Sequence, residues 1–416
     1  MDLLILVTAL AAQAAAPAGS TPPAQTTTET TEGPRTGSTS YADLEAGAGY
    51  ATNPILSQAN SPGAGFGRIS VHAVHTRVSA RTTTVLSGYA QSLFYTRHYG
   101  SEQSVDVNAR HDALVNEHVR VFGDLDASYD RGGQLDTTII DVPNVPLPPG
   151  TTVPPILLPG GGDFLSVTGK QYRESGHIGV QLSLSPRDSL TATGGVEHVV
   201  FKSGSLDTNY TTIPVSLGYS RQINPRTSVG ARVVAQHTDY SGPSSFNVVS
   251  PEATFQTNLT ERMSLSGAVG VSFASVDNGI STRHSTGLTA NANLCSINPR
   301  GHLCIVGAID QESATVAGPA RNISVGADYS RRLNADDTIN FSLSGNRYSS
   351  PISVITGRTF SHATYVRAAG DYTRRLGDRW FGGVTLAARK VTQSGPDPDA
   401  DISGSLFIRY RLGDVR

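Results

Sequence analysis

The feature that most constrains the fold is an alternation of apolar and polar residues with a period of two. Within 119–130, Val121, Leu125 and Tyr129 fall on one face of an extended chain, while Asp124 and Asp126 fall on the other. The same alternation recurs near 177–184, 228–236, 323–330 and 339–344. An amphipathic helix has a period near 3.6 and cannot produce this pattern. The chain is therefore predicted to consist of amphipathic β-strands.

The length of these segments indicates where the strands lie. Each is about ten residues long, which is the length a tilted strand needs to cross a bilayer. No run of 18 or more apolar residues occurs, so a helical membrane protein is excluded. Gly is abundant at 43 residues and Met occurs only 2 times, as expected for strands with one apolar and one polar face. The predicted fold is all-β, a single transmembrane antiparallel β-barrel.

The connections alternate between tight turns and longer polar loops, as in outer-membrane barrels with periplasmic turns and external loops. Turn-forming residues cluster near 116–118, 185–188, 224–227, 260–262, 334–337 and 377–379. Longer loops are predicted near 52–66, 96–103, 131–168, 202–210, 241–247, 277–320, 348–358 and 392–400.

Counting these segments predicts about sixteen strands, with fourteen to eighteen possible. An even number places both termini in the periplasm. The count depends most on 67–95, where the alternation shifts, and on 284–308, where a hairpin that extends above the membrane is the alternative.

Three regions are expected along the chain. Residues 1–14 form a short apolar run that ends in small residues, typical of a signal peptide, although Asp2 departs from the usual basic start. Residues 15–40 are rich in Pro, Thr and Glu and are expected to form a disordered periplasmic tail. Residues 41–416 are expected to form the outer-membrane barrel.

A short motif recurs where strands approach the turns: an aromatic on the apolar face, followed by a basic residue. It occurs at Tyr219, Tyr329, Tyr372 and Tyr410. Interfacial aromatic residues form girdles at both edges of membrane barrels. These tyrosines are expected to form the periplasmic girdle, with arginines at the aqueous rim.

Cys295 and Cys304 are the only cysteines, and in an oxidising compartment they are expected to form a disulfide. With two cysteines and no histidine cluster beside them, His302 notwithstanding, no metal site is expected. The disulfide would close part of the loop predicted at 277–320. That loop and the Pro-rich loop at 131–168 are both candidates for an infolded lid; a plain external loop is the alternative.

The polar faces of the strands carry charged residues that would line the pore. A barrel of this size leaves an aqueous channel. The predicted pore-lining residues are Asp106, Asp112, Asp124, Asp126, Arg232, Glu252, Asp328, Arg367, Asp371, Arg389 and Arg409.

These charges are distributed unevenly along the sequence. Asp43, Glu45 and the four aspartates just named up to Asp126 belong to early strands, whereas the arginines, with Arg411, belong to later ones. Acidic and basic walls would create a transverse field across the pore. The alternative is local neutralisation, in which Glu252, Asp328, Asp371 and Arg110 compensate each wall.

Several function classes are disfavoured. The net charge is −2 with both signs interspersed, so no nucleic-acid partner is expected. The 11 histidines are scattered, and neither a nucleophile elbow, a zinc-protease motif nor a phosphate loop is present. The chain is expected not to be an enzyme and to need no cofactor.

Two segments carry a resemblance to known families. Residues 402–412 alternate Ile402, Leu406, Ile408 and Tyr410 with polar residues and resemble the terminal strand that the barrel-assembly machinery recognises, although the chain continues to Arg416, so the recognition signal is expected to be internal. Residues 44–54 resemble the first strand of a proteobacterial β-barrel porin-like group associated with exopolysaccharide export.

The resemblance implies an outer-membrane channel that acts as an auxiliary barrel in exopolysaccharide export or assembly. A general diffusion porin for small polar solutes is the alternative, and a structural or adhesive surface protein is the third. The implied location is the outer membrane of a Gram-negative cell. The implied partners are outer-membrane lipid and lipopolysaccharide, the assembly machinery, and polysaccharide or export-complex proteins.

Overall fold

The computed structural model describes residues 36–54, 56, 62–97, 99–131, 170–202, 209–314, 318–349, 363–393 and 399–414. In this part of the chain every regular element is a β-strand. No helix long and apolar enough to cross a membrane occurs among these residues. The signal peptide expected at 1–14 and the loop expected at 131–168, apart from Arg131, lie outside the described residues.

Eighteen strands, counted over the described residues, form the wall. They are β1 (Gly37–Ala51), β2 (Ala64–Val78), β3 (Thr82–Tyr95), β4 (Ser101–Asn116), β5 (Val119–Arg131), β6 (Lys170–Ser183), β7 (Asp188–Lys202), β8 (Tyr210–Asn224), β9 (Thr227–Tyr240), β10 (Ser245–Thr260), β11 (Met263–Asp277), β12 (Thr282–Asn298), β13 (Gly301–Ala314), β14 (Gly318–Arg332), β15 (Asp337–Ser349), β16 (Ala363–Arg375), β17 (Trp380–Gln393) and β18 (Asp401–Gly413). Because β1 begins at Gly37, residues 37–40 belong to the barrel and not to the predicted tail.

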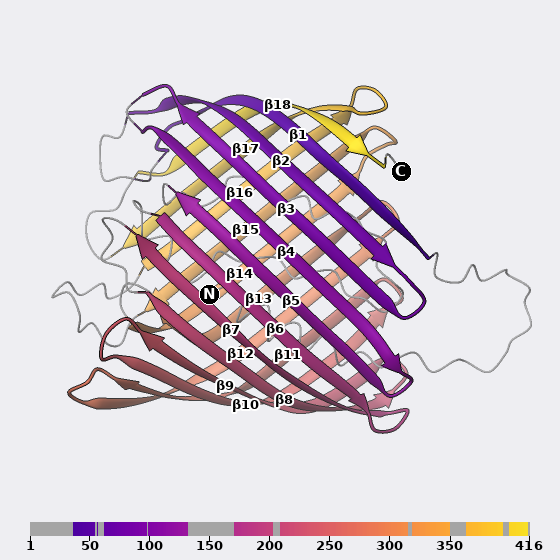
Figure 1. Ribbon diagram of the computed structural model, residues 1–416, viewed down its shortest axis with the longest axis vertical. Helices are drawn as coiled ribbons and strands as arrows, with labels where there is room; N and C mark the ends of the chain where they lie inside the picture. Colours follow the sequence, from indigo (N-terminus) through magenta and orange to yellow (C-terminus); the bar gives the residue numbers. More distant parts are fainter. Residues whose placement is uncertain are drawn as a thin grey trace, which may run out of the picture.

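Each strand pairs antiparallel with the next one in the sequence, and β1 also pairs with β18 (Figure 1). The last pairing runs from Tyr41↔Gly413 to Ala51↔Ser403. It closes the sheet on itself, so that neither β1 nor β18 is left as an open edge. The fold is a closed antiparallel β-barrel with a simple up-and-down order.

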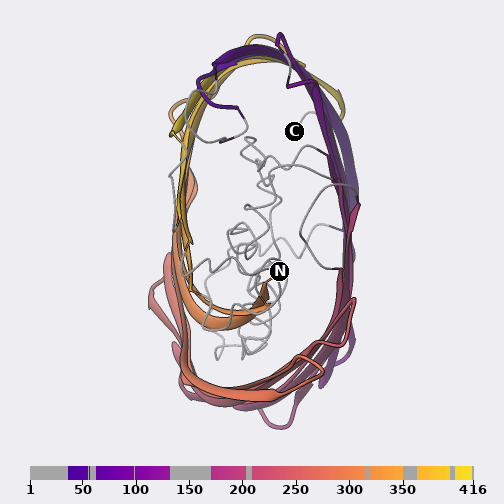
Figure 2. The same ribbon diagram turned by 90° about the vertical axis from the view of Figure 1, so that its left-hand side faces the viewer.

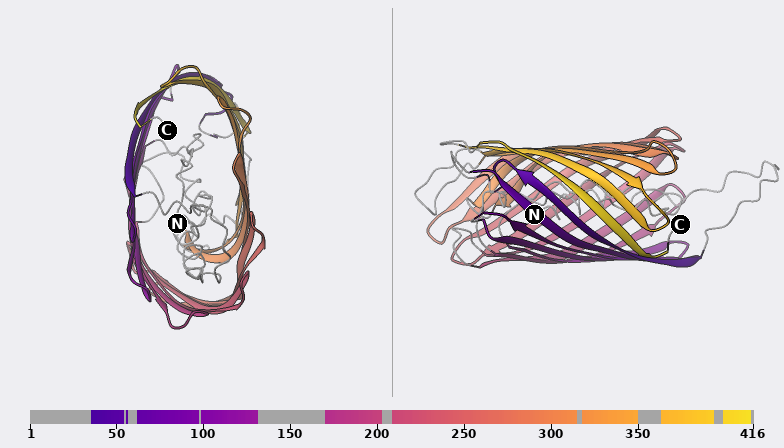
Figure 3. Two further views of the ribbon diagram at one scale, coloured as in Figure 1. Left: turned by 90° about the vertical axis from the view of Figure 1, so that its right-hand side faces the viewer. Right: turned by 90° about the horizontal axis from the view of Figure 1, so that it is seen from above.

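The barrel is oval in cross-section (Figures 2 and 3). Strands β3–β5 form one of its long sides, and strands β14–β17 lie opposite, across the narrower dimension. The closing seam, defined here as strands β18, β1 and β2, lies at one narrow end. Strands far apart in the sequence therefore face each other across the interior.

The two faces of the wall have opposite chemistry. Leu44 is 43% exposed whereas its neighbour Glu45 is 8% exposed, and Leu125 is 65% exposed whereas Asp124 is 7% exposed. Side chains of successive residues in a strand point to opposite faces, so the apolar residues form the outer face and the polar ones the inner face. This is the reverse of a protein dissolved in water, in which apolar side chains are the buried ones.

The strand number corrects the sequence prediction. The barrel has 18 strands, at the upper limit of the predicted range and not about sixteen. The segment predicted as a loop at 277–320 contains β12 and β13, which are joined by a tight turn at 299–300. This hairpin is part of the barrel wall and does not extend above it. A second turn that the sequence pattern did not predict lies at 79–81, within the uncertain stretch 67–95.

The connections differ between the two ends of the barrel. One end, called the turn end, carries the eight short turns at 79–81, 117–118, 184–187, 225–226, 261–262, 299–300, 333–336 and 376–379, together with the start of β1 and the end of β18. The other end, called the loop end, carries the remaining connections. These include the longest one, between Arg131 and Lys170, but also short ones at 241–244 and 278–281. The predicted turns all lie at the turn end.

The disulfide lies in the wall. Cys295 on β12 and Cys304 on β13 are directly opposite each other and are joined by a disulfide. Both are buried on the inner face, close to the turn at 299–300. The bond therefore links the two strands of a hairpin, and the predicted role as the staple of a lid loop is wrong.

The four tyrosines of the recurring motif lie on the outer face at the turn end. The Tyr219 hydroxyl donates to Asp188 at 2.5 Å, and the Tyr372 hydroxyl donates to Asp337 at 2.6 Å. The Tyr410 ring packs against Trp380, with ring centroids 4.7 Å apart. Each hydroxyl bond fastens an outward aromatic to the first residue of a neighbouring strand. The turn end thus carries a belt of aromatic rings with polar tips.

Candidate functional site: the inner face of the barrel

The inner face brings together the residues predicted to line a pore. All eleven lie on the inward register of their strands: Asp106 and Asp112 on β4, Asp124 and Asp126 on β5, Arg232 on β9, Glu252 on β10, Asp328 on β14, Arg367 and Asp371 on β16, Arg389 on β17 and Arg409 on β18. Their part in conduction remains a prediction. The structure adds the partners of several of these charges.

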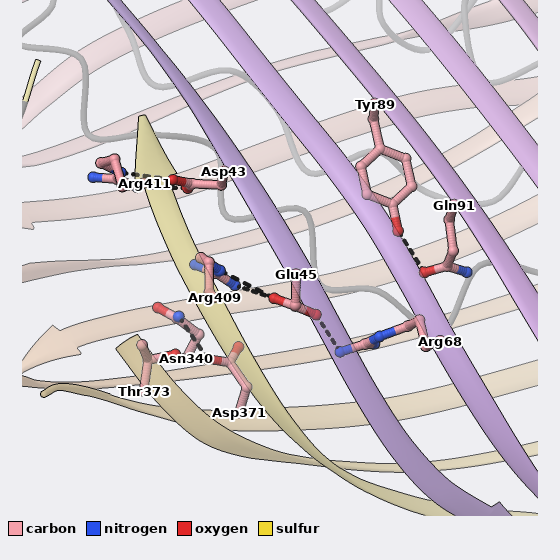
Figure 4. A network of polar contacts seen from close by, with 10 residues as sticks. All are labelled: Asp43, Glu45, Arg68, Tyr89, Gln91, Asn340, Asp371, Thr373, Arg409 and Arg411. Atoms are coloured by element: carbon pink, nitrogen blue, oxygen red, sulfur yellow. Dashed lines mark hydrogen bonds and ion pairs between the residues drawn. The ribbon is translucent and has the colours of Figure 1, made fainter. Parts of the chain in front are cut away.

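The closing seam carries a ladder of charge-assisted contacts (Figure 4). Arg411 contacts both oxygens of Asp43, at 2.7 and 2.6 Å. At the next inward pair, Arg409 donates twice to one oxygen of Glu45, at 3.0 and 2.9 Å. The other oxygen of Glu45 accepts from Arg68 on β2. Planar guanidinium groups suit such paired contacts.

The register of the seam explains these contacts. Asp43 is directly opposite Arg411, and Glu45 is directly opposite Arg409. Arg68 sits diagonally from Glu45, one inward position along β2. All three strands present alternate residues inward, so the five side chains meet on one face. A slip of one residue would turn the acidic or the basic set to the outer face.

Aromatic rings on the same face flank the arginines. The guanidinium carbon of Arg411 lies 4.4 Å from the Tyr41 ring centroid and 5.3 Å from that of Phe381. Arg409 and Arg68 lie 5.3 and 5.9 Å from the centroid of Phe407. These distances are in the range of cation–π attraction. We call this set the seam strip: Tyr41, Phe381, Arg411, Arg409, Phe407 and Arg68.

The strip continues toward the loop end through further aromatics. Phe66 on β2 and Tyr95 on β3 are T-shaped neighbours, with centroids 6.1 Å apart. The Tyr95 ring in turn meets Tyr99 at 5.8 Å, and the Tyr95 hydroxyl donates to Glu102 at 3.3 Å. Arginine and aromatic side chains thus follow the inner face from one end of the seam to the other.

A further ion pair holds the loop end of the seam. Arg389 on β17 donates to Asp401 at 3.0 Å and to the carbonyl of Pro54 at 2.5 Å. The other carboxylate oxygen of Asp401 accepts from the backbone N–H of Asn53 at 2.8 Å. Asp401 is 0% exposed, and its contacts fasten the chain after β1 to the start of β18. The sequence pattern did not select Asp401, because it lies at a strand start beside a predicted loop.

The long side formed by β4 and β5 has a different balance of charge. Its inward positions hold six carboxylates and two arginines: Glu102, Asp106, Asp112, Asp124, Asp126, Asp130, Arg110 and Arg120. Arg120 contacts both oxygens of Asp112, with distances between 2.5 and 3.0 Å. His177 on β6 lies 3.1 Å from Asp124. We call this group of eight residues the acidic wall.

Two further groups of inward charges have partners on adjacent strands. Arg232 donates to Glu252 from Nε at 2.9 Å and also from Nη2. Thr289 donates to the other oxygen of Glu252 at 3.0 Å. His302 lies 2.5 Å from Asp328. Buried charges are tolerated when they are paired and hydrogen-bonded in this way.

Asp371 accepts from neutral side chains on its own and the neighbouring strand. Asn340 donates to it at 3.1 Å and Thr373 at 3.2 Å (Figure 4).

The inward arginines Arg232, Arg389 and Arg409 each have a carboxylate partner on an adjacent strand. Local neutralisation describes them better than a purely basic wall does. The excess of carboxylates on β4 and β5 agrees with the acidic side of the predicted field.

Sequence reasoning missed Arg68, Arg173 and Glu197. Arg68 lies in the stretch where the alternation shifts. Arg173 on β6 contacts Glu197 on β7 at 3.3 Å. Their inward parity was available from each strand alone, but their partners were not. Among the described residues, no group of three or more His, Cys, Asp or Glu is arranged to hold a metal ion.

No family model and no curated protein matches the sequence. Among solved structures, OccK2 (OpdF) of Pseudomonas aeruginosa is similar with a TM-score of 0.43 and 9% identity, covering 91% of this chain and 98% of that one. A BenF-like porin of Pseudomonas fluorescens has a TM-score of 0.43 and 8% identity, with 91% and 99% covered. The FrpB iron transporter of Neisseria meningitidis has a TM-score of 0.41 and 8% identity, with 85% of this chain covered; this chain spans 62% of FrpB. The description of the barrel rests on its own strand pairing.

Proposed function

We propose that this protein is an outer-membrane channel for polar solutes. The observation that carries the proposal is the closed barrel of 18 strands with exposed aliphatic side chains on the outer face and polar ones on the inner face. Only helices and closed barrels satisfy all backbone hydrogen bonds within lipid. Barrels of sixteen to eighteen strands are wide enough to leave an aqueous route.

The connections support an orientation in that membrane. Bacterial barrels have short turns and both chain ends on the periplasmic side and longer loops outside. The turn end has those properties and also carries the aromatic belt with Trp380 and Tyr410. We assign the turn end to the periplasm and the loop end to the cell surface. The barrel-assembly machinery would act on β18, whose alternation supplies an internal recognition strand.

The seam strip supports a saccharide as the transported solute. Aromatic faces offer apolar surface to sugar rings, and alternating guanidinium and carboxylate groups offer donors and acceptors to hydroxyl groups. Phe407, Arg409 and Phe66 supply such groups along the length of the wall. Together with the resemblance of residues 44–54 to barrels associated with exopolysaccharide export, this makes an auxiliary role in polysaccharide export our preferred assignment.

A general diffusion porin is the second candidate, and the acidic wall favours it. The excess of carboxylates over arginines on β4 and β5 would bias a water-filled route toward small cations without recognising a saccharide. The two candidates share the fold and location and differ in what interrupts the current. A structural or adhesive surface protein would conduct nothing.

The test is single-channel conductance of the refolded chain in a planar bilayer, with and without oligosaccharide fragments. We expect steady current that the fragments block, and a weaker block in Phe407→Ala. The matched control is Phe341→Ala, which removes an outward ring that is 43% exposed. Current without block would assign the protein to the diffusion porins, and absence of current at all voltages would refute a channel.

A further inference from the structure

The three lysines of this chain all lie near the same end of the barrel. Of 32 basic residues only three are lysine, and the rest are arginine. Lys170 is the first residue of β6, Lys202 is the last residue of β7, and Lys390 lies three residues before the end of β17. All three are near the loop end. Their side chains lie on the outer face, because each strand alternates between inward residues such as Arg389 and outward ones. The rare ammonium groups therefore occur on the outer surface, at the end assigned to the cell exterior.

Two of the lysines form a row of like charges with an arginine. Arg131 on β5 is directly opposite Lys170, and Lys170 is directly opposite Lys202. Neighbouring strands are only about 4.8 Å apart, and like charges directly opposite each other destabilise a sheet. Neither Arg131 nor Lys170 forms an ion pair with a carboxylate in the described part of the chain. Anionic groups from outside would offset this repulsion.

Aromatic and aliphatic residues follow the basic row toward the middle of the barrel. Tyr129 and Tyr172 are the next outward residues, and their ring centroids lie 4.9 Å apart. The Lys202 ammonium lies 5.3 Å from the Tyr172 ring centroid. Further along the same strands, Leu125 and Ile178 are 65% and 63% exposed. The order from basic to tyrosine to aliphatic matches the order from headgroup to interface to acyl chain.

Among the described residues, one carboxylate shares this surface. Glu174 lies between the tyrosine row and the aliphatic residues, directly opposite His198. His198 in turn contacts Thr211 at 2.8 Å. Glu174 lies one row further from the loop end than the tyrosines, so the described residues of this surface carry more positive than negative charge.

The turn end provides the contrast within the same molecule. Arg221 lies 3.9 Å from Asp188, and Arg374 lies 3.9 Å from Asp337. These outward arginines have carboxylates of the same chain beside them, at the edge assigned to the periplasm. At the loop end, Arg131 and Lys170 have no carboxylate of the described residues beside them in this way, although both edges would meet lipid headgroups. The difference points to an anionic ligand at the outer edge.

We propose that Arg131, Lys170 and Lys202 bind the phosphate groups of lipopolysaccharide in the outer leaflet, with the acyl chains lying along Leu125 and Ile178. The proposal rests on the proposed function, because it requires the loop end to face the outer leaflet. Ammonium groups are compact donors suited to phosphate, and each basic residue near an anionic surface adds to the attraction.

The experiment measures lipid binding to the refolded full chain in detergent by native mass spectrometry. Its probes are lipid A with both phosphates, dephosphorylated lipid A, and free pyrophosphate. The variant is Arg131→Gln, Lys170→Gln and Lys202→Gln combined. The matched control combines Arg221→Gln, Arg331→Gln and Arg374→Gln, which removes three outward charges at the turn end. A heat-modifiable band in gel electrophoresis establishes that each variant is folded.

We expect the loop-end variant to bind phosphorylated lipid A at least tenfold more weakly than the wild type, and the turn-end variant to be unchanged. Dephosphorylated lipid A should bind the wild type and the loop-end variant equally, and pyrophosphate should not compete. Equal binding of both lipids by the wild type, or undiminished binding by the loop-end variant, would overturn the site. Competition by pyrophosphate would replace the lipid assignment with a free-anion site.

The same preparations separate this inference from the proposed function. Conductance is measured in bilayers that contain no lipopolysaccharide, where the loop-end variant should conduct like the wild type. Binding of phosphorylated lipid A by a protein that never conducts would support the lipid site and refute the channel. Conductance without discrimination between the lipids would support the channel and refute the lipid site.

Discussion

Two links on the inner face, the closing seam and the β12–β13 hairpin, hold strands together by different means. In the seam, Glu45 and Arg409 are 364 residues apart in the sequence, and Asp43 and Arg411 are 368 apart. In the hairpin, Cys295 and Cys304 are 9 apart and are joined covalently. The long-range contact is thus made by ion pairs, and the short-range contact by a disulfide.

The difference shows where the barrel depends most on its side chains. The cost of bringing two chain positions together rises with the logarithm of their separation, which makes the seam more costly than the hairpin by about 3 kcal/mol. The hairpin is already closed by the turn at 299–300, whereas β1 and β18 lie at opposite ends of the barrel sequence and are not joined by a turn. The noncovalent ladder should therefore matter more than the covalent bond.

The largest effect is expected from Glu45→Gln. This change leaves Arg409 and Arg68 without their shared carboxylate on a face where Glu45 is 8% exposed. Removing one partner of a buried ion pair costs about 3 kcal/mol. Denaturant unfolding of the refolded barrel in detergent should show this loss. Glu174→Gln, on the outer face, is the control, and a similar loss there would contradict the role of the seam.

A charge exchange measures how much of the seam's stability comes from a single pair. Asp43→Arg alone and Arg411→Asp alone should each destabilise the barrel, because each creates like charges across the seam. The double exchange should recover part of the loss, with a coupling energy of about 2 kcal/mol in a double-mutant cycle. Additive losses would show that Asp43 and Arg411 do not stabilise each other.

Removing the disulfide should have a smaller effect. Cys295→Ala combined with Cys304→Ala is expected to lower the unfolding free energy by about 1 kcal/mol, because the bond closes a short segment whose ends the hairpin already holds together. The measurement is the same unfolding curve, compared with the wild type under oxidising and reducing conditions. A loss larger than that of Glu45→Gln would reverse the comparison between the two links.

The smallest expected effect, in energy, concerns the acidic wall. Asp106, Asp126 and Asp130 lie on β4 and β5, where carboxylates outnumber arginines, so changing all three to Asn should reduce the preference for cations. A change of about one kT in the electrostatic energy of a cation near this wall corresponds to about a threefold change in the selectivity for cations. The reversal potential in a salt gradient measures it. Arg409→Gln, in the seam, provides a comparison. If the reversal potential of the aspartate variant is unchanged, the acidic wall does not contribute to cation preference.

The sequence predicted the two faces of the wall because that information is local. The inward positions of Asp124, Arg232 and Asp371 follow from the parity of each strand, and all eleven predicted pore-lining residues have that parity. The predicted turns near 185–188, 224–227 and 334–337 also follow from local residue preferences. Each of these predictions needed only about ten neighbouring residues.

The strand number was harder to predict for a local reason. The turn at 79–81 is Ser-Ala-Arg, which lacks the glycine, proline or asparagine found in the turns at 225–226, 333–336 and 376–379. On β12, two neighbouring outward residues are the alanines Ala290 and Ala292, so the contrast between the two faces is weak. The stretch 277–320 therefore resembled a polar loop and concealed two strands.

By itself, the sequence determined that the chain forms amphipathic strands, that they are joined by turns at one end, and which side chains share a face. Only the tertiary structure decided that 18 strands close the barrel, that Glu45 meets Arg409 and Arg68, and that Lys170 lies between Arg131 and Lys202. The physical reason is that parity is a property of one strand, whereas register is a property of two. Where those two strands are separated by a long connection or by the whole length of the chain, no local pattern specifies how they align.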